Sequence, residues 1–233
     1  MPSRREFIKS TTLAAGTTAL MATTQAQANP AVTKKTEPFR QKLLDGLGGP
    51  WPKGGDLKTK KLKTEQKDGY RLEWITYELE PGDRCPAILL VPDGVSDKST
   101  APAVAIWHQH AGQYHLGKTE PAGLAGNPMH HTGAALAKLG YVVLCPDALC
   151  FEERQDPQKK LRGGAYERFE FLRYTVAGPC MAWKNILDMK RAIDYLVSRP
   201  EVKADRLGCY GHSMGSTHTW LVGPWEPRLR ALV

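Results

Sequence analysis

The chain has 233 residues, of which 41% are hydrophobic and 24% are charged, and its formal net charge is +8. This composition is typical of a globular chain with enough apolar residues for a sizeable core, and one domain is the default at this length. No stretch reaches the roughly 18 to 20 apolar residues of a membrane span, so we expect no stable membrane insertion.

The N-terminus has the features of a twin-arginine export signal. Arg4 and Arg5 precede a mildly apolar stretch, residues 10–24, and the small-residue triplet 26–28. A charged start, a weakly hydrophobic middle and a small-residue cleavage site are typical of an exported protein. We therefore expect residues 1–28 to be a signal peptide, the Tat export machinery to be a partner, and the mature protein to be periplasmic or secreted. A disordered basic tail is the alternative.

Residues 29–54 are predicted to form a linker and a short helix, the helix lying at 38–47, and residues 55–233 are predicted to form the main domain. Strands are expected at 58–65 and 71–79, as an antiparallel pair at a sheet edge, because the first is rich in lysine and has alternating polar character. Few aromatic residues interleave with these lysines, so a surface for stacking nucleic-acid bases is not indicated.

Three continuous apolar runs follow, at residues 85–91, 101–107 and 141–145. Runs without alternation are typical of strands that are covered on both faces. Apolar residues at helical spacing predict a helix over residues 181–197. Strands that alternate with helices predict an α/β fold, with a mostly parallel, doubly wound sheet and right-handed crossovers.

The five cysteines are odd in number and show no CxxC spacing, so they define no disulfide framework. Cys145 and Cys209 fall inside apolar runs and are predicted to be buried small hydrophobic residues. A bridge between Cys150 and Cys180 is compatible with an oxidising compartment, but the sequence does not pair them.

The pentapeptide 211–215, Gly-His-Ser-Met-Gly, follows the apolar run 206–210 and precedes a segment that can begin a helix. This context is typical of a nucleophile elbow, which exposes the hydroxyl of Ser213 at a tight strand-to-helix turn. An ordinary surface serine in a glycine-bounded loop is the alternative. The carboxyl ends of parallel strands share one edge, so we expect Ser213, the loop 108–112 and Asp147 at that edge.

A serine nucleophile needs a histidine base, a carboxylate that orients the base, and donors for the oxyanion. The amide of Met214 is one expected donor, and the loop 108–112 is expected to supply the other. Asp147 lies in a Pro-Asp turn and is predicted to be structural, bonding loop amides or an arginine such as Arg154. Its alternative role is the catalytic acid.

Four further segments are informative together, WHQHAGQ at 107–113, GYVVLCPDA at 140–148, RAIDYLVSRPEVKADRLGCYGHSMG at 191–215 and EPRLRALV at 226–233. Through these segments the chain resembles the α/β-hydrolase superfamily, in the dienelactone hydrolase and acetyl xylan esterase-like branch, over about residues 55–233. The resemblance implies an α/β-hydrolase fold in which Ser213 is the nucleophile and the amides of Met214 and His110 form the oxyanion hole, with Gln109 as the less favoured donor.

The same resemblance implies cleavage of carboxylic esters or lactones through an acyl-enzyme, without a metal or another cofactor. The substrate would be a small-molecule or carbohydrate ester, and acetylated sugars are suggested by analogy alone. The sequence does not define the substrate or the oligomeric state.

In this superfamily the acid and the histidine follow the serine in chain order. The chain ends at Val233, so we expect both residues beyond it. The fold would then be incomplete after the start of the sixth strand, at 226–233, and this chain would be inactive alone. A non-catalytic exported binding protein on the same scaffold is the alternative, if the chain ends there naturally.

The seven histidines allow two further alternatives, a zinc site or an upstream histidine that serves as the base for Ser213. No HExxH or Cys/His spacing supports zinc, so no metal is expected. An upstream base would break the usual chain order of the triad. The histidines are His108, His110, His115, His130, His131, His212 and His218.

Overall fold

The computed structural model describes residues 30–233, with side chains from Thr36 onward. The expected signal peptide, residues 1–28, lies outside the described residues. The chain divides into two compact units, which end and begin at Gln41 and Lys42, and helix α1 (Pro30–Leu47) spans that division. The helix includes residues 30–35, which were expected to be a linker. Proline suits a first helical turn, and the following alanine, lysines and glutamate are compatible with a helix.

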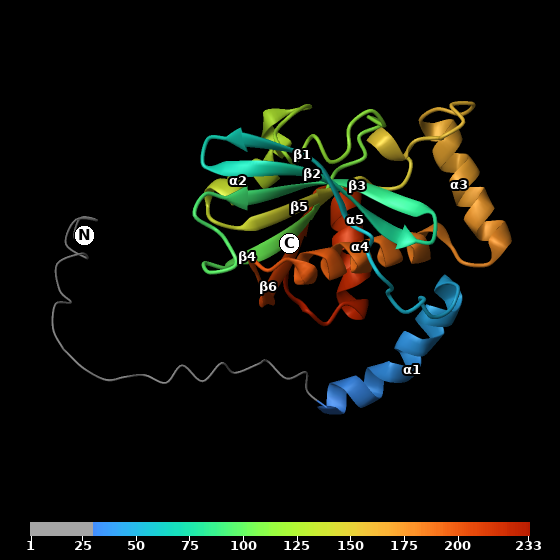
Figure 1. The fold of residues 1–233 in the computed structure, drawn as a ribbon. Helices are drawn as coiled ribbons and strands as arrows, with labels where there is room; N and C mark the ends of the chain where they lie inside the picture. Colours follow the sequence, from blue (N-terminus) through green and yellow to red (C-terminus); the bar gives the residue numbers. More distant parts are fainter. Residues whose placement is uncertain (1–29) are drawn as a thin grey trace, which may run out of the picture. The chain divides into compact units, whose positions relative to one another are not determined.

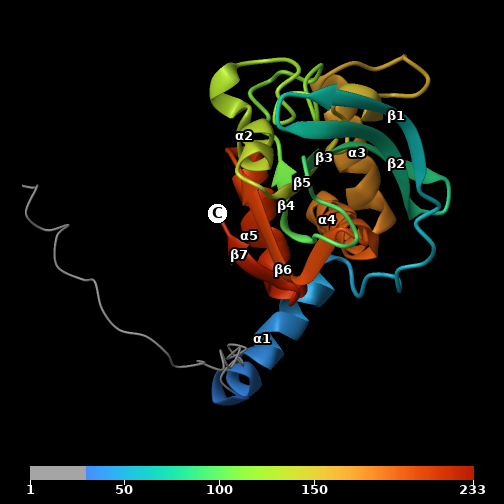
Figure 2. The ribbon, with the colours of Figure 1, turned by 60° about the vertical axis from the view of Figure 1, so that its left-hand side comes forward.

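A seven-stranded sheet forms the centre of the unit 42–233, in the order β1-β2-β3-β5-β4-β6-β7. Figure 2 shows β1 and β2 at the edge of the sheet away from β7. The strands are β1 (Lys60–Lys67), β2 (Tyr70–Glu80), β3 (Asp83–Pro92), β4 (Ala101–Trp107), β5 (Val142–Pro146), β6 (Val202–Gly211) and β7 (Leu229–Leu232).

The strand directions make this a mostly parallel sheet. Strands β5, β4, β6 and β7 pair in parallel, whereas β3 is antiparallel to both β5 and β2, and β1 is antiparallel to β2. Strand β2 therefore points the same way as β5, and five of the seven strands share one direction. The expected antiparallel edge pair is confirmed, and the lysine-rich β1 is the exposed edge strand.

Helices cover both faces of the sheet, as Figure 1 shows, with α2 on one side and α4 and α5 on the other. Alternate residues of each central strand point into two cores. Leu89, Ala105 and Leu144 pack with α4, whereas Leu90, Ile106 and Val143 pack on the face that α2 covers. The main helices of this unit are α2 (Thr132–Lys138), α3 (Gly164–Ala177), α4 (Met181–Ser198) and α5 (Met214–Val222).

Helix α3 was not expected from the sequence, and it lies beside α4 at the margin of the domain (Figure 1). Its buried face consists of Tyr166, Glu170 and Tyr174, with a carboxylate at the centre. Its apolar Phe169, Phe171 and Leu172 are about half exposed, so no continuous apolar stripe marks the helix in the sequence. All five cysteines are free thiols, so the Cys150–Cys180 bridge is not formed, and Cys145 and Cys209 are buried as expected.

Among the described residues, no helix is both long and apolar enough to cross a membrane.

Candidate active site

The turn between β6 and α5 has the backbone of a strained elbow. Ser213 has φ 55° and ψ −116°, a region that residues with a side chain rarely adopt. A Cβ atom at Gly211 would overlap the carbonyl oxygen of Gly215, and one at Gly215 would overlap the carbonyl oxygen of Trp107. The two glycines therefore allow the start of α5 to pass against both β6 and the end of β4. An ordinary loop serine would require none of these features.

Ser213 is exposed at this turn, and among the described residues its hydroxyl has no hydrogen-bond partner. Its carbonyl oxygen accepts bonds from the amides of Ser216 and Thr217, at 3.0 and 3.2 Å, which fixes the first turn of α5. The amide of Met214 donates no hydrogen bond within the described part of the chain. This amide lies at the positive end of the helix dipole, where it is available to an anion.

His108 ties the loop after β4 to the loop after β5. Its Nε2 accepts a bond of 3.1 Å from the amide of Ala148, so the proton lies on Nδ1, which donates to the carbonyl oxygen of Gln109 at 2.8 Å. Burial lowers the pKa of His108 to about 4, because the charged imidazolium is poorly solvated there. The ring is neutral near pH 7, and both its nitrogens are engaged.

His110 lies in the same loop, next to Ala111 and Gly112, which both have positive φ. The Nδ1 of His110 accepts a bond of 2.9 Å from the amide of Gly112, so its Nε2 carries the proton and donates to Glu167 at 3.1 Å. The backbone amides of Gln109 and His110 donate no hydrogen bond to any described residue. The loop thus has free amides at the strand end, while the imidazole of His110 is fully occupied.

The remaining histidines offer no alternative base that a carboxylate orients. His131 bonds the carbonyl oxygen of Ala125, and the rings of His130 and His212 lie 4.9 Å apart. His218 is buried on α5, and burial lowers its pKa to about 4. Within residues 36–233, His110 with Glu167 is the one histidine–carboxylate pair. The upstream-base alternative therefore gains no support from the described residues.

Asp147 follows β5 and is bonded on both carboxylate oxygens. Its Oδ1 accepts from the amide of Lys118 at 2.7 Å, and its Oδ2 accepts from Lys118 Nζ at 2.9 Å and from the amide of Glu153 at 3.3 Å. Burial raises the pKa of Asp147 to about 7, against the opposing effect of the Lys118 charge. Asp147 therefore bonds loop amides, as expected of a structural residue, whereas Arg154 contacts only its main-chain oxygen among the described bonds.

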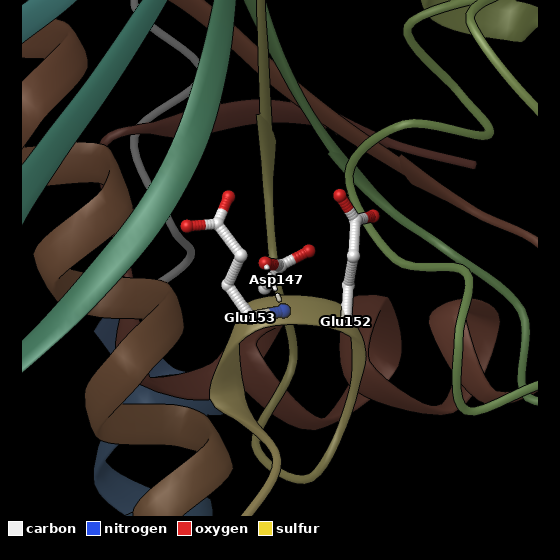
Figure 3. Close-up of side chains that lie close together, drawn as sticks. All are labelled: Asp147, Glu152 and Glu153. Atoms are coloured by element: carbon white, nitrogen blue, oxygen red, sulfur yellow. Dashed lines mark hydrogen bonds between the residues drawn. The ribbon is translucent and has the colours of Figure 1, made fainter. Parts of the chain in front are cut away.

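Figure 3 shows the carboxylates of Asp147, Glu152 and Glu153 gathered at the end of β5. Within the part of the chain that the structure describes, this is the one group of three or more acidic, histidine or cysteine side chains with the spacing of metal ligands. Lys118 Nζ lies 2.9, 2.7 and 2.7 Å from the three carboxylates, so a buried ammonium supplies the positive charge there. No histidine belongs to the group, so the zinc alternative gains nothing from it.

Known proteins resemble this chain in sequence and in fold. "Putative hydrolase YtaP" of Bacillus subtilis (strain 168) is 29% identical over 197 residues, which are 83% of this chain and 62% of that protein. A "putative acetyl xylan esterase" of Bacteroides fragilis NCTC 9343 superposes with a TM-score of 0.71 at 18% identity, over 87% of this chain and 53% of that one. This chain thus spans about half to three-fifths of the length of these two proteins.

The acetyl xylan esterase of Paenibacillus sp. R4 superposes with a TM-score of 0.57 at 19% identity, over 76% of this chain and 53% of that one. At such identities the solved structures show the α/β-hydrolase fold alone. The model of the dienelactone hydrolase family matches residues 94–233, which is more than half of the chain and includes the elbow and the loops after β4 and β5. The chain belongs to the dienelactone hydrolase family.

Proposed function

We propose that the chain is part of a serine hydrolase that cleaves carboxylic esters through an acyl-enzyme on Ser213. The strained elbow carries this proposal. It holds Ser213 at φ 55°, where the residue is exposed and its hydroxyl has no partner among the described residues. Backbone strain of this kind costs free energy and is concentrated at active sites, where it presents a reactive group. Membership of a hydrolase family supports the same reading.

The oxyanion of the tetrahedral intermediate would be bound by the amides of Met214 and His110. Both amides are free of hydrogen bonds within the described residues, and both lie at carboxyl ends of adjacent strands, β6 and β4. Such preformed donors stabilise the charge that develops on the carbonyl oxygen, and one donor is typically worth about 10²-fold to 10³-fold in kcat. Gln109 is the less favoured alternative for the donor from the loop after β4. Its amide is also free of hydrogen bonds within the described residues.

The histidine base and the acid of the triad would lie beyond residue 233. The proposal is supported by the ring nitrogens of His108 and His110, which are engaged, and by the carboxylate of Asp147, which is saturated. It is further supported by the relatives, of which this chain spans 53% to 62%. These 233 residues alone would then bind and orient an ester but lack the group that accepts the proton of Ser213.

The substrate class follows only by analogy. Two fold neighbours are named acetyl xylan esterases, at 18% and 19% identity, and a fold shared at that level hosts many activities. An exported protein with this fold would meet carbohydrate esters outside the cytoplasm, which favours acetylated sugars within the proposal. Export itself is proposed from Arg4 and Arg5 and the segment that follows them.

The test compares the product of the longest reading frame that contains these residues with its Ser213→Ala variant. Both are assayed with p-nitrophenyl acetate, an ester that needs no specific sugar contact. The proposal expects turnover by the longer protein, loss of turnover in Ser213→Ala, and none by residues 29–233 alone. Turnover that survives in Ser213→Ala would refute the serine mechanism. A frame that stops after codon 233, with a folded product that binds esters without cleaving them, would favour the binding protein.

A further inference from the structure

The carboxylate of Glu167 links helix α3 to the loop after β4. It accepts a bond of 3.1 Å from His110 Nε2, and the hydroxyl of Tyr114 donates to its Oε2 at 2.6 Å. Both donors belong to the loop that offers the free amide of His110. Burial and the bond to Glu167 raise the pKa of Tyr114 to about 12, so its hydroxyl remains a donor near neutral pH. One carboxylate on α3 therefore fixes the loop at two points.

The geometry of His110 makes this link directional. Its Nδ1 accepts from the amide of Gly112, two residues further along the loop, so Nε2–H must face Glu167. A hydrogen-bonded imidazole with one defined tautomer holds the backbone on either side of it in a single conformation. The side chain of His110 is thus anchored on both nitrogens and restrains the loop that carries the amide of His110.

The start of α3 is shaped to receive Tyr114. A Cβ at Gly163 would lie 3.0 Å from the Tyr114 ring, and one at Gly164 would lie 3.2 Å from its hydroxyl oxygen. Gly163 also has φ 51°, which glycine adopts readily. Side chains at these two positions would push Tyr114 away from Glu167, so the glycines preserve the contact between α3 and the loop.

The ring of Phe151 packs against two aromatic side chains of the same loop. It is 1% exposed, and its ring centroid lies 5.0 Å from that of Tyr114 and 5.1 Å from that of His110. Its neighbours Cys150 and Glu152 both have positive φ, an unusual conformation for residues with side chains. The amide of Glu152 donates to the carbonyl oxygen of Tyr114 at 2.8 Å. A strained segment thus holds Phe151 against the two rings.

Met214 and Tyr114 both pack against the buried cluster of Cys150, Phe151 and Tyr166. The residue after the proposed nucleophile and the loop that carries His110 therefore rest on the same aromatic group. The two amides that our proposed function assigns to the oxyanion come from segments far apart in sequence. The cluster gives them a common support.

We propose that Glu167 is a positioning residue for catalysis, which sets the amide of His110 through the imidazole of His110 and the hydroxyl of Tyr114. This inference rests on the proposed function, since it assumes that the amide of His110 stabilises an oxyanion. Glu167 itself does not touch the reacting atoms. A displacement of about 1 Å in a group that contacts the transition state can cost about 10²-fold in rate.

The experiment measures kcat and KM for p-nitrophenyl acetate with the full-length protein and the variants Glu167→Ala, Glu167→Gln and Tyr114→Phe. We expect Glu167→Ala to lower kcat by about 10²-fold and to change KM little, because an interaction specific to the transition state is lost. Glu167→Gln keeps an acceptor oxygen and should recover most of kcat. Tyr114→Phe removes one of the two contacts and should give an intermediate loss.

Arg168→Ala, at an exposed neighbouring position on α3, is the matched control and should leave both constants unchanged. A kcat that is unaffected in folded Glu167→Ala, while Ser213→Ala is inactive, would overturn the inference and leave the proposed function intact. Activity that persists in Ser213→Ala would instead overturn the proposed function. If Glu167→Ala does not fold, Tyr114→Phe decides, and a wild-type kcat in that variant would overturn the inference.

Discussion

Ser213 and Asp147 lie at the ends of two strands that flank β4 on either side, yet their surroundings are opposite. Ser213 is exposed, has a strained backbone, and its hydroxyl has no partner among the described residues. Asp147 is 2% exposed, and both its oxygens are bonded. Both residues follow the carboxyl ends of parallel strands, where active sites of such sheets are usually found. They differ in their hydrogen-bond partners, and this difference determines which group is available for a reaction. A saturated carboxylate holds loops together, and an unpartnered hydroxyl is free for a substrate.

The contrast depends on Lys118, which is 1% exposed and bonded by Asp147 and Glu152. The backbone of the preceding residue, Gly117, also lies against Asp147, because a Cβ at Gly117 would overlap the carboxylate of Asp147. Buried charges are tolerated when each has an opposite charge and its hydrogen bonds. Lys118 therefore joins the segment after β4 to the segment after β5.

The strongest test of the buried region is Lys118→Met, which removes the ammonium and leaves the buried Asp147 without its cation. Breaking a buried ion pair in this way costs about 3–5 kcal/mol of unfolding free energy. Denaturation by urea measures the change. Lys138→Met is the control, because Lys138 and its partner Asp68 are exposed, and its urea midpoint should match the wild type. Equal midpoints for the two variants would contradict a structural role for Lys118.

At the elbow, Gly215→Ala should cost about 3 kcal/mol, because the new methyl group overlaps the backbone of Trp107 and forces the start of α5 away from β4. The same displacement would move the amide of Met214, so esterase activity of the longer protein should fall as well. Ser216→Ala, at the next and exposed position, should change stability by less than about 0.5 kcal/mol. Urea denaturation and the ester assay of both variants check this, and a stable, active Gly215→Ala would contradict the packing described.

The buried histidines predict how stability depends on pH. His108 and His218 have pKa values lowered to about 4 in the folded protein, against an ordinary value of 6.5. Between these values the two histidines bind more protons in the unfolded chain, so their contribution to the unfolding free energy falls as pH drops from about 6.5 to about 4, whereas the raised pKa of Asp147 acts in the opposite direction. Each histidine contributes about 1.4 kcal/mol per pH unit in that window.

His218→Leu should therefore reduce this slope by about 1.4 kcal/mol per pH unit. His115→Leu, at an exposed position, should leave the slope unchanged. Urea denaturation at a series of pH values gives the slopes, and an unchanged slope in folded His218→Leu would mean that His218 is not buried in the neutral form.

The smallest expected effect separates strain from chemistry at Ser213 itself. Ser213→Gly relieves the positive φ and should raise stability by about 1 kcal/mol, whereas Ser213→Ala keeps the strain and should not. For a domain of this size the difference corresponds to about 2–4 °C in Tm. Both variants should be inactive. Identical Tm values for the two variants would show that the elbow stores no strain.

The sequence predicted the strands that lead to the candidate site well, because apolar runs and the elbow are local patterns. The run 101–107 coincides with β4, and the segments before Asp147 and Ser213 are strands as expected. The polar partners could not be predicted in the same way, since Lys118 meets Asp147, and His110 meets Glu167, only after distant segments pack. Their pairing depends on three-dimensional distance, which neither spacing nor periodicity encodes.

Helix α3 was missed for a related reason. Its residues Phe169, Phe171 and Leu172 are exposed, so no apolar stripe marks it, and its contribution to the site is one carboxylate, Glu167. The direction of β3 could not be predicted from the sequence either. Its apolar run predicted burial on both faces correctly, but burial does not distinguish a parallel from an antiparallel neighbour.

The central claim is that Ser213 attacks an ester carbonyl, and labelling with a fluorophosphonate followed by peptide mass spectrometry tests it most directly. The full-length protein should gain one adduct, on the peptide that contains Ser213, and the Ser213→Ala variant should gain none. The rate of ester hydrolysis should fall in parallel with labelling. An adduct on another residue, or ester turnover by an enzyme in which Ser213 remains unlabelled, would contradict the account.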